Sequence, residues 1–232
     1  MSPVIGFDAD DTLWHCENHF AHAQEQFMQL LAPYRPKNIA LEQLYETEKH
    51  NMRLYGYGVK GFVLSMIETA VDVTDGRMHG HDIKRIIELG RDILDQKLEL
   101  IDGARPVLET LANSHRLLLI TKGDLLDQEA KIARSGLGGL FTGIEIVSEK
   151  DAGAYSRLLA EHGVPPEQFV MVGNSLRSDI LPVLSLGGRG IHIPYRITAP
   201  HEQVSDEDLD GLALLRADDI RDVPHLIRRL EA

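Results

Sequence analysis

The chain has 232 residues, of which 36 are Asp or Glu and 24 are Lys or Arg, so its formal net charge is −12 at pH 7. This acidic balance argues against binding to a nucleic-acid backbone or to an anionic membrane surface, since both need clustered Lys and Arg. With 43% hydrophobic and 26% charged residues, the composition is that of a folded globular protein with a sizeable core.

The N-terminal segment and the single cysteine bear on the cellular location. The first ten residues, MSPVIGFDAD, lack the basic and then apolar stretch of a secretory leader. No apolar run approaches the about 20 residues that a membrane-spanning helix needs. Cys16 alone can form neither an intramolecular disulfide nor a multi-cysteine zinc site. We therefore expect a soluble, cytoplasmic protein.

Five short apolar runs predict buried strands, because each is short and is followed by polar or turn-forming residues. They cover residues 4–7, 117–120, 144–147, 169–172 and 191–193. Helical patterns separate the last four runs, at 125–136, 154–163 and 177–188, and a final helix is expected at 223–232. Gly136, Gly163 and Gly187 stand where the first three helices should end. Alternating strands and helices predict an α/β fold with a doubly wound parallel sheet.

The stretch between the first and second strands has a different pattern. It contains four helical segments, at 19–31, 40–55, 59–71 and 81–98, with apolar residues at three- and four-residue steps. We therefore expect a Rossmann-like core formed by residues 1–14 and 101–232, with an inserted all-helical cap domain at 15–100.

Acidic residues crowd the end of the first predicted strand, in the sequence FDADDTLW. Asp8 and Asp10 alternate along the chain, so their carboxylates can point at one small volume. Carboxylates so close together repel, which favours a hard cation such as Mg²⁺ between them. An acidic turn that caps a helix is an equally simple explanation of this cluster on its own.

Polar residues also follow the other strands. Thr121 and Lys122 end the second strand, Lys150 follows the third, and the loop GNSLRSD, with Asn174 and Asp179, follows the fourth. Each of these taken alone is better explained as a strand, surface or capping residue. Because ligands of doubly wound sheets bind at the carboxyl ends of the strands, the four positions together predict one site.

The order of these four motifs closely resembles that of the haloacid dehalogenase-like hydrolases. That superfamily has Asp-x-Asp-x-Thr, a Ser or Thr, a Lys and an acidic loop on successive strands, and many members carry a helical cap after the first motif. The resemblance covers nearly the whole chain. It implies a Mg²⁺-dependent phosphatase that acts through an aspartyl-phosphate.

The resemblance also implies a role for each residue. Asp8 would be the nucleophile, and Asp10 would donate a proton to the leaving oxygen and later take one from water, which calls for a raised pKa. Asp8, the backbone carbonyl of Asp10 and Asp179 would hold Mg²⁺. Thr121 would hydrogen-bond the phosphoryl group, and Lys150 would neutralise its charge and tether Asp8.

Three residues depart from the pattern of the superfamily. Asp11 stands where many members have Gly, and we interpret it as a turn residue. Lys122 stands where Asn is common; its backbone N–H can still bind phosphate, and its side chain could add positive charge. Asn174 stands where an Asp often contacts the metal, so it is a candidate metal ligand of weaker affinity than a carboxylate.

The expected substrate is a small phosphorylated metabolite. Because the dehalogenase branch lacks an acid two residues after the nucleophile, Asp10 favours phosphatase chemistry. A phosphomutase or a 2-haloacid dehalogenase that uses the same Asp8 stays open as an alternative, as does a non-catalytic binding protein with the same fold. The sequence indicates neither the substrate nor the oligomeric state.

Overall fold

The computed structural model describes residues 2–205, 209 and 214–231. These residues fall into two compact units. Unit 1 lies within residues 1–15, 98–122 and 128–232, and unit 2 comprises residues 16–97 and 123–127. The assignment of a catalytic core and a cap, divided at residues 14/15 and 100/101, stays a prediction.

Unit 1 is built on a six-stranded sheet whose paired strands are all parallel. The strands are β1 (Val4–Phe7), β2 (Leu117–Lys122), β3 (Gly143–Val147), β4 (Phe169–Gly173), β5 (Arg189–His192) and β6 (Leu215–Arg216). Their order across the sheet is β3-β2-β1-β4-β5-β6, so strand order reverses beside β1. The predicted α/β fold with a doubly wound parallel sheet is therefore confirmed.

The five predicted strands agree with β1 to β5 to within two residues at each end. The sixth strand was not predicted. At two residues, β6 is too short to leave a hydrophobic pattern in the sequence.

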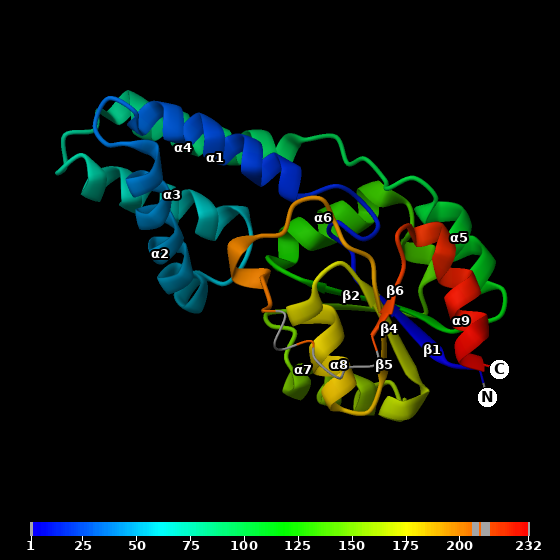
Figure 1. Cartoon of the computed structure of the whole chain (residues 1–232). Coiled ribbons are helices and arrows are strands. Elements are labelled where there is room, and N and C mark those ends of the chain that lie inside the picture. Colours follow the sequence, from blue (N-terminus) through cyan, green and yellow to red (C-terminus); the bar gives the residue numbers. More distant parts are fainter. Residues whose placement is uncertain (1, 206–208, 210–213, 232) are drawn as a thin grey trace. The chain divides into compact units, whose positions relative to one another are not determined.

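Helices cover both faces of the sheet (Figure 1). They are α5 (Ala104–Ala112), α6 (Leu125–Ser135), α7 (Ala152–Glu161), α8 (Leu181–Ser185) and α9 (Val223–Glu231). Residues Ile5, Phe7, Leu119 and Val172 pack with α5 and α9, whereas Leu118, Ile120, Phe169 and Met171 pack with α7 and α8. Successive strand residues thus point into opposite layers, as in any strand that is buried on both faces.

Most helix ends in unit 1 follow the sequence signals. Gly136, Gly163 and Gly187 follow α6, α7 and α8 with positive φ angles of 63°, 66° and 86°, as predicted for helix-ending glycines. Helix α5 was not predicted, although its buried residues Val107 and Leu111 have helical spacing.

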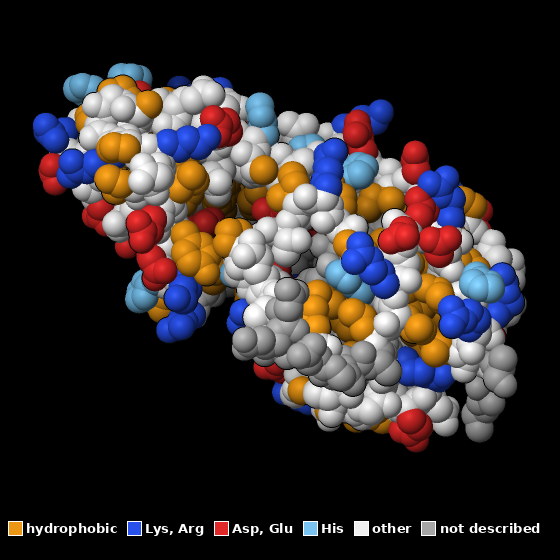
Figure 2. Space-filling model, in the orientation of Figure 1, with side chains coloured by type: hydrophobic (Ala, Val, Ile, Leu, Met, Phe, Trp, Pro, Cys, Tyr) orange, Lys and Arg blue, Asp and Glu red, His pale blue; other side chains and the backbone are white. Residues whose placement is uncertain are grey.

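Unit 2 is helical and has its own core. Its helices are α1 (Glu17–Leu31), α2 (Lys37–Tyr55), α3 (Val59–Val73) and α4 (Gly80–Asp95). Phe27, Leu44, Met66 and Ile86 lie at the centre of this core and are almost fully buried. No helix among the described residues has the length and apolarity needed to cross a membrane. On the face in Figure 2, Lys and Arg side chains are interspersed with Asp and Glu rather than gathered in one patch.

Candidate active site

Asp8 lies directly after β1, between the ends of β2 and β4. Its backbone N–H donates to the carbonyl of Val172 at 2.9 Å, so Asp8 still continues the sheet pairing. The chain then turns, because the N–H groups of Thr12 and Leu13 both donate to the carbonyl of Ala9. This turn brings the Thr12 hydroxyl to within 3.0 Å of Asp8 Oδ2, to which it donates.

Asp11 has a φ of 62°, in the left-handed region that favours glycine. Asp is one of the few other residues that tolerate this conformation, because its short polar side chain can hydrogen-bond locally. The interpretation of Asp11 as a turn residue is therefore confirmed, and the conformation explains how it can replace a glycine.

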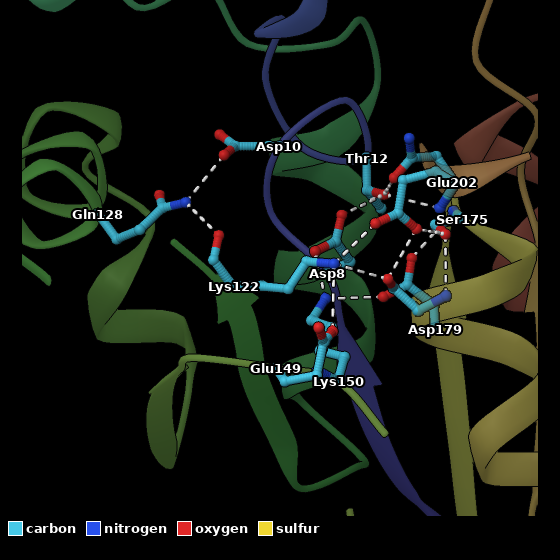
Figure 3. Close-up of polar contacts among 12 residues, drawn as sticks. Asp8, Asp10, Thr12, Lys122, Gln128, Glu149, Lys150, Ser175, Asp179 and Glu202 are labelled. Atoms are coloured by element: carbon cyan, nitrogen blue, oxygen red, sulfur yellow. Dashed lines mark hydrogen bonds and ion pairs between the residues drawn. The ribbon is translucent and has the colours of Figure 1, made fainter. Parts of the chain in front are cut away.

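Lys150 bridges two carboxylates at the centre of the site (Figure 3). It lies between β3 and α7, and its Nζ is 2.5 Å from Asp8 Oδ1 and 2.7 Å from Asp179 Oδ1. Only 2% of its side chain is exposed. Burial alone would lower the pKa of Lys150, but the charges of Asp179 and Asp8 outweigh it and raise this pKa well above its usual value. Lys150 is therefore a permanent cation.

Even with this cation, the surroundings of Asp8 disfavour its charged form. Burial raises the pKa of Asp8 most, and the charge of Asp179 raises it further. Lys150 lowers this pKa, but the net result is a pKa of about 7. A carboxylate nucleophile must be ionised, so Asp8 needs further positive charge nearby to be fully active at neutral pH.

Oxygen donors converge on the side of Asp8 that faces away from Lys150. One polar atom of the Asn174 amide lies 3.1 Å from Asp8 Oδ2 and 3.2 Å from the backbone oxygen of Asp10. With the amide nitrogen in this position, Asn174 donates to both oxygens. With the amide oxygen there, three oxygens meet, an arrangement that a cation would stabilise.

This donor set fits Mg²⁺, which prefers carboxylate and carbonyl oxygens. The described residues contain no cluster of three His, Cys, Asp or Glu side chains suited to a metal. The converging donors are of a mixed kind, namely one carboxylate, one amide and one backbone carbonyl. A divalent cation here would also supply the positive charge that Asp8 needs.

Both carboxylate oxygens of Asp179 accept hydrogen bonds. Its Oδ1 accepts from Lys150, and its Oδ2 accepts from the backbone N–H of Ser175 at 3.0 Å. A Cβ on Gly173 would lie 2.3 Å from Asp179 Oδ2, so only glycine at this position lets the carboxylate come so close. One Asp179 oxygen thus contacts Lys150 and the other a backbone amide of the loop after β4.

The Asp10 carboxylate points away from Asp8, toward α6 (Figure 3). Trp14 Nε1 donates to it at 2.7 Å, Gln128 Nε2 at 2.8 Å and Lys131 Nζ at 3.1 Å. Burial alone would raise the pKa of Asp10, but Lys131 and these hydrogen bonds outweigh it and lower this pKa. The expectation of a raised pKa was wrong, because Lys131 and Gln128 on α6, together with Trp14, surround the carboxylate.

Thr121 has a hydroxyl with no partner among the described residues. It is the last residue but one of β2, with 1% of its surface exposed, and its Oγ1 makes no hydrogen bond. A buried polar group without a partner is costly, so this hydroxyl is suited to a ligand that accepts a hydrogen bond.

Lys122 is engaged by residues that the sequence analysis did not select. Its Nζ donates to Glu202 Oε1 at 2.7 Å, to Ser178 Oγ at 2.9 Å and to Glu149 Oε1 at 3.4 Å. The Glu202 carboxylate also accepts from the hydroxyls of Ser175 and Ser178. Although burial alone would raise it, Lys122 and both hydroxyls lower the pKa of Glu202 to about 2. The positive charge of the Lys122 side chain is therefore already compensated.

Comparison with known families agrees with this geometry. Residues 3–187 match the haloacid dehalogenase-like hydrolase family. The chain belongs to this family. It is therefore an enzyme of the hydrolase class, as the four strand-end motifs predicted.

The chain is similar to three proteins of known name or structure. A haloacid dehalogenase-like hydrolase from Xanthomonas campestris is 43% identical, with a TM-score of 0.87 over 98% of this chain and 91% of that one. Mouse N-acylneuraminate-9-phosphatase is 31% identical over 129 residues, which are 52% of this chain and 51% of that protein. This chain thus matches about half the length of the mouse enzyme.

An L-2-haloacid dehalogenase from Xanthobacter autotrophicus is 15% identical, with a TM-score of 0.65 over 99% of both chains. At this identity the likeness concerns the fold alone. The fold therefore does not by itself separate a dehalogenase from a phosphatase.

The residues selected from the hydrolase motifs meet in unit 1. Asp8, Lys150 and Asp179 form one buried network, and Asn174 joins it through Asp8 and Thr12. Thr121 and Lys122 lie together at the end of β2. Of Asp10, only the backbone oxygen faces Asn174. The sequence analysis missed Gln128, Lys131 and Glu202, and it gave Ser175 and Ser178 of the fourth-strand loop no role in the site.

Proposed function

We propose that this hydrolase is a Mg²⁺-dependent phosphatase that acts on a small phosphomonoester through an aspartyl-phosphate at Asp8. The observation that supports this most is the buried Asp8 carboxylate, held between Lys150 on one side and the Asn174 amide and the backbone oxygen of Asp10 on the other. Phosphoryl transfer needs alignment and compensation of charge more than covalent chemistry, and this arrangement can supply both.

In the first step, an Asp8 oxygen attacks phosphorus and the bond from phosphorus to the ester oxygen breaks. The Thr12 hydroxyl and Lys150 hold the Asp8 carboxylate in a fixed orientation. Thr121 Oγ1 donates to a phosphoryl oxygen, which gives this buried hydroxyl the partner that it lacks. Asp10 gives its proton to the departing oxygen, so the alcohol leaves neutral.

In the second step, water attacks phosphorus and the bond from phosphorus to Asp8 breaks. Asp10, now ionised, takes a proton from the water. Its lowered pKa suits this step, in which it acts as a base. To act as the acid in the first step, the carboxylate must gain a proton, which the charge of Lys131 opposes.

Asp8, the backbone oxygen of Asp10 and Asn174 would hold Mg²⁺. The sequence analysis named Asp179 as the main ligand of its loop; we propose instead that Asn174 takes this role and that Asp179 positions Lys150. When bound, Mg²⁺ supplies positive charge that keeps Asp8 ionised and offsets the charge on the phosphoryl group.

A generic aryl phosphate tests this proposal. We expect hydrolysis with Mg²⁺ present and a loss of at least about 100-fold after chelation, reversed by added Mg²⁺. Turnover that is unaffected by chelation would contradict the proposal. Release of inorganic phosphate separates hydrolysis from phosphomutase activity, and assays with 2-haloacids test for a dehalogenase.

The role of Asp10 can be tested through Lys131. If protonated Asp10 is the acid, the acid form disappears as the pH rises through its pKa, and kcat/KM falls on that alkaline limb. Because Lys131 lowers this pKa, Lys131→Met should move the limb to higher pH. Lys131→Arg keeps the charge and should leave the limb in place. An unchanged limb in the Met variant would show that Asp10 is not the acid.

A further inference from the structure

The Glu202 carboxylate lies at the centre of a hydrogen-bonded cluster with Lys122, Ser175 and Ser178. The hydrolase motifs do not explain this cluster. Glu202 ends the short 3₁₀ helix η4 (Pro200–Glu202), which follows β5. Its Oε1 accepts from Lys122 Nζ, and its Oε2 accepts from the Ser178 hydroxyl at 2.7 Å and from the Ser175 hydroxyl. One carboxylate therefore joins the end of β2 to the loop after β4 (Figure 3).

The ion pair between Lys122 and Glu202 is shielded from water. Only 12% of the Lys122 side chain and 14% of the Glu202 side chain are exposed. At such burial an ion pair is not screened as surface pairs are, and removal of one partner leaves a costly uncompensated charge. Lys122 and Glu202 therefore stabilise each other's charge.

The segment that carries Glu202 is also held near its beginning. Tyr195, seven residues earlier, has its hydroxyl 2.7 Å from His15 Nδ1, at the end of the segment that follows Asp8. Separate polar contacts at Tyr195 and Glu202 thus hold residues 195–202 against other segments of unit 1, and the position of Glu202 does not depend on the Lys122 pair alone.

The serines that Glu202 binds belong to the loop that carries Asn174 and Asp179. Ser175 directly follows Asn174, and its N–H donates to Asp179 Oδ2. Ser178 directly precedes Asp179, and its N–H donates to Ser175 Oγ. Hydrogen bonds from both hydroxyls to Glu202 therefore stabilise the loop conformation that presents Asn174 and Asp179.

We propose that Glu202 is a positioning residue that neutralises Lys122 and fixes the loop 174–179, so that Lys150 and Thr121, and not the Lys122 side chain, bind the phosphoryl group. The proposal rests on the proposed phosphatase function. Glu202 keeps a second ammonium group from holding the phosphate product. Release of that product requires binding that is not too tight.

Removal of the Glu202 charge should change the affinity for phosphate. If Glu202 neutralises Lys122, the direction of this change is opposite to that expected if Glu202 is only structural. In Glu202→Gln, Lys122 loses the nearer and more buried of its two carboxylate partners and keeps only the exposed Glu149, so phosphate should bind more tightly. If Glu202 only supports the loop, its loss should weaken phosphate binding. The two explanations thus predict changes of opposite sign.

A double-mutant cycle tests the proposal on the Mg²⁺-loaded full chain, with inorganic phosphate titrated by calorimetry. We expect Glu202→Gln to tighten phosphate binding about fivefold to tenfold and Lys122→Met to weaken it by a similar factor, as expected for one charge near a dianion. The double variant, in which both charges are gone, should return to within about twofold of the wild type. Glu149→Gln, which removes an equal charge from the more distant partner of Lys122, should change affinity less than about twofold.

Weaker phosphate binding by Glu202→Gln, or a double variant that is no closer to the wild type than either single variant, would overturn the proposal. Thermal unfolding without phosphate gives a second readout. Each single variant should lower Tm by about 5 °C, and the double variant by less than the sum. Additive Tm changes would also contradict the pairing. If the wild type binds no phosphate, the proposed function fails, and the unfolding cycle still decides whether the pair exists.

Discussion

Asp8→Asn should lose on the order of 10⁴-fold or more of the phosphatase kcat, because an amide cannot act as the nucleophile that a carboxylate provides. The amide keeps the size of the side chain, and its loss of charge relieves the repulsion from Asp179 that raises the pKa of Asp8. We therefore expect Tm to stay the same or rise. Steady-state kinetics and thermal unfolding, measured on one preparation, check both expectations.

Asp11→Asn is the matched control for this variant. It is the same chemical change three residues along the same loop, and Asn tolerates the left-handed conformation of Asp11 as Asp does. It should keep kcat to within a few-fold. If Asp8→Asn retains activity comparable to that of Asp11→Asn, Asp8 is not the nucleophile.

Lys150→Met should cost both activity and stability. It leaves Asp8 and Asp179 buried without their shared cation, and loss of one partner from a buried ion pair costs about 3–5 kcal/mol. It also removes the influence that lowers the pKa of Asp8, so a smaller fraction of Asp8 is ionised at neutral pH. We expect kcat to fall on the order of 10³-fold or more, because phosphoryl transfer also loses a compensating charge.

Added Mg²⁺ distinguishes the two effects of this substitution. High Mg²⁺ should recover part of the lost Tm, because a cation near Asp8 replaces some of the missing charge, but it should not restore kcat. Lys150→Arg keeps the charge and should retain more stability than Lys150→Met. A Met variant with nearly normal kcat and Tm would contradict the role of Lys150.

The sequence was sufficient to predict the strands whose residues are buried on both faces of the sheet. The strand at residues 4–7 was predicted with its observed bounds, because a fully buried central strand is a continuous apolar run that ends sharply at Asp8. The four motifs could be grouped into one site because parallel strands end at the same edge of the sheet. Both inferences depend on short-range patterns.

The parts that were missed depend on contacts distant in sequence. Glu202 lies 80 residues from Lys122 along the chain, and no local pattern indicates that the two meet. The orientation of Asp10 is decided by Gln128 and Lys131 on α6, whereas the motif alone suggested a carboxylate that faces Asp8. Spacing within the fourth motif does not show where the Asp179 side chain points, since this depends on the hydrogen bonds that it accepts from Lys150 and Ser175.

The covalent intermediate is the most direct test of the proposed function. The protein would be mixed with Mg²⁺ and an excess of aryl phosphate, quenched in acid within one turnover, and digested for mass spectrometry. We expect one added phosphoryl group on the peptide that contains Asp8, located at Asp8 by fragmentation and absent from Asp8→Asn. Rapid turnover with no phosphoryl group on Asp8, or with the group on another residue, would contradict the account.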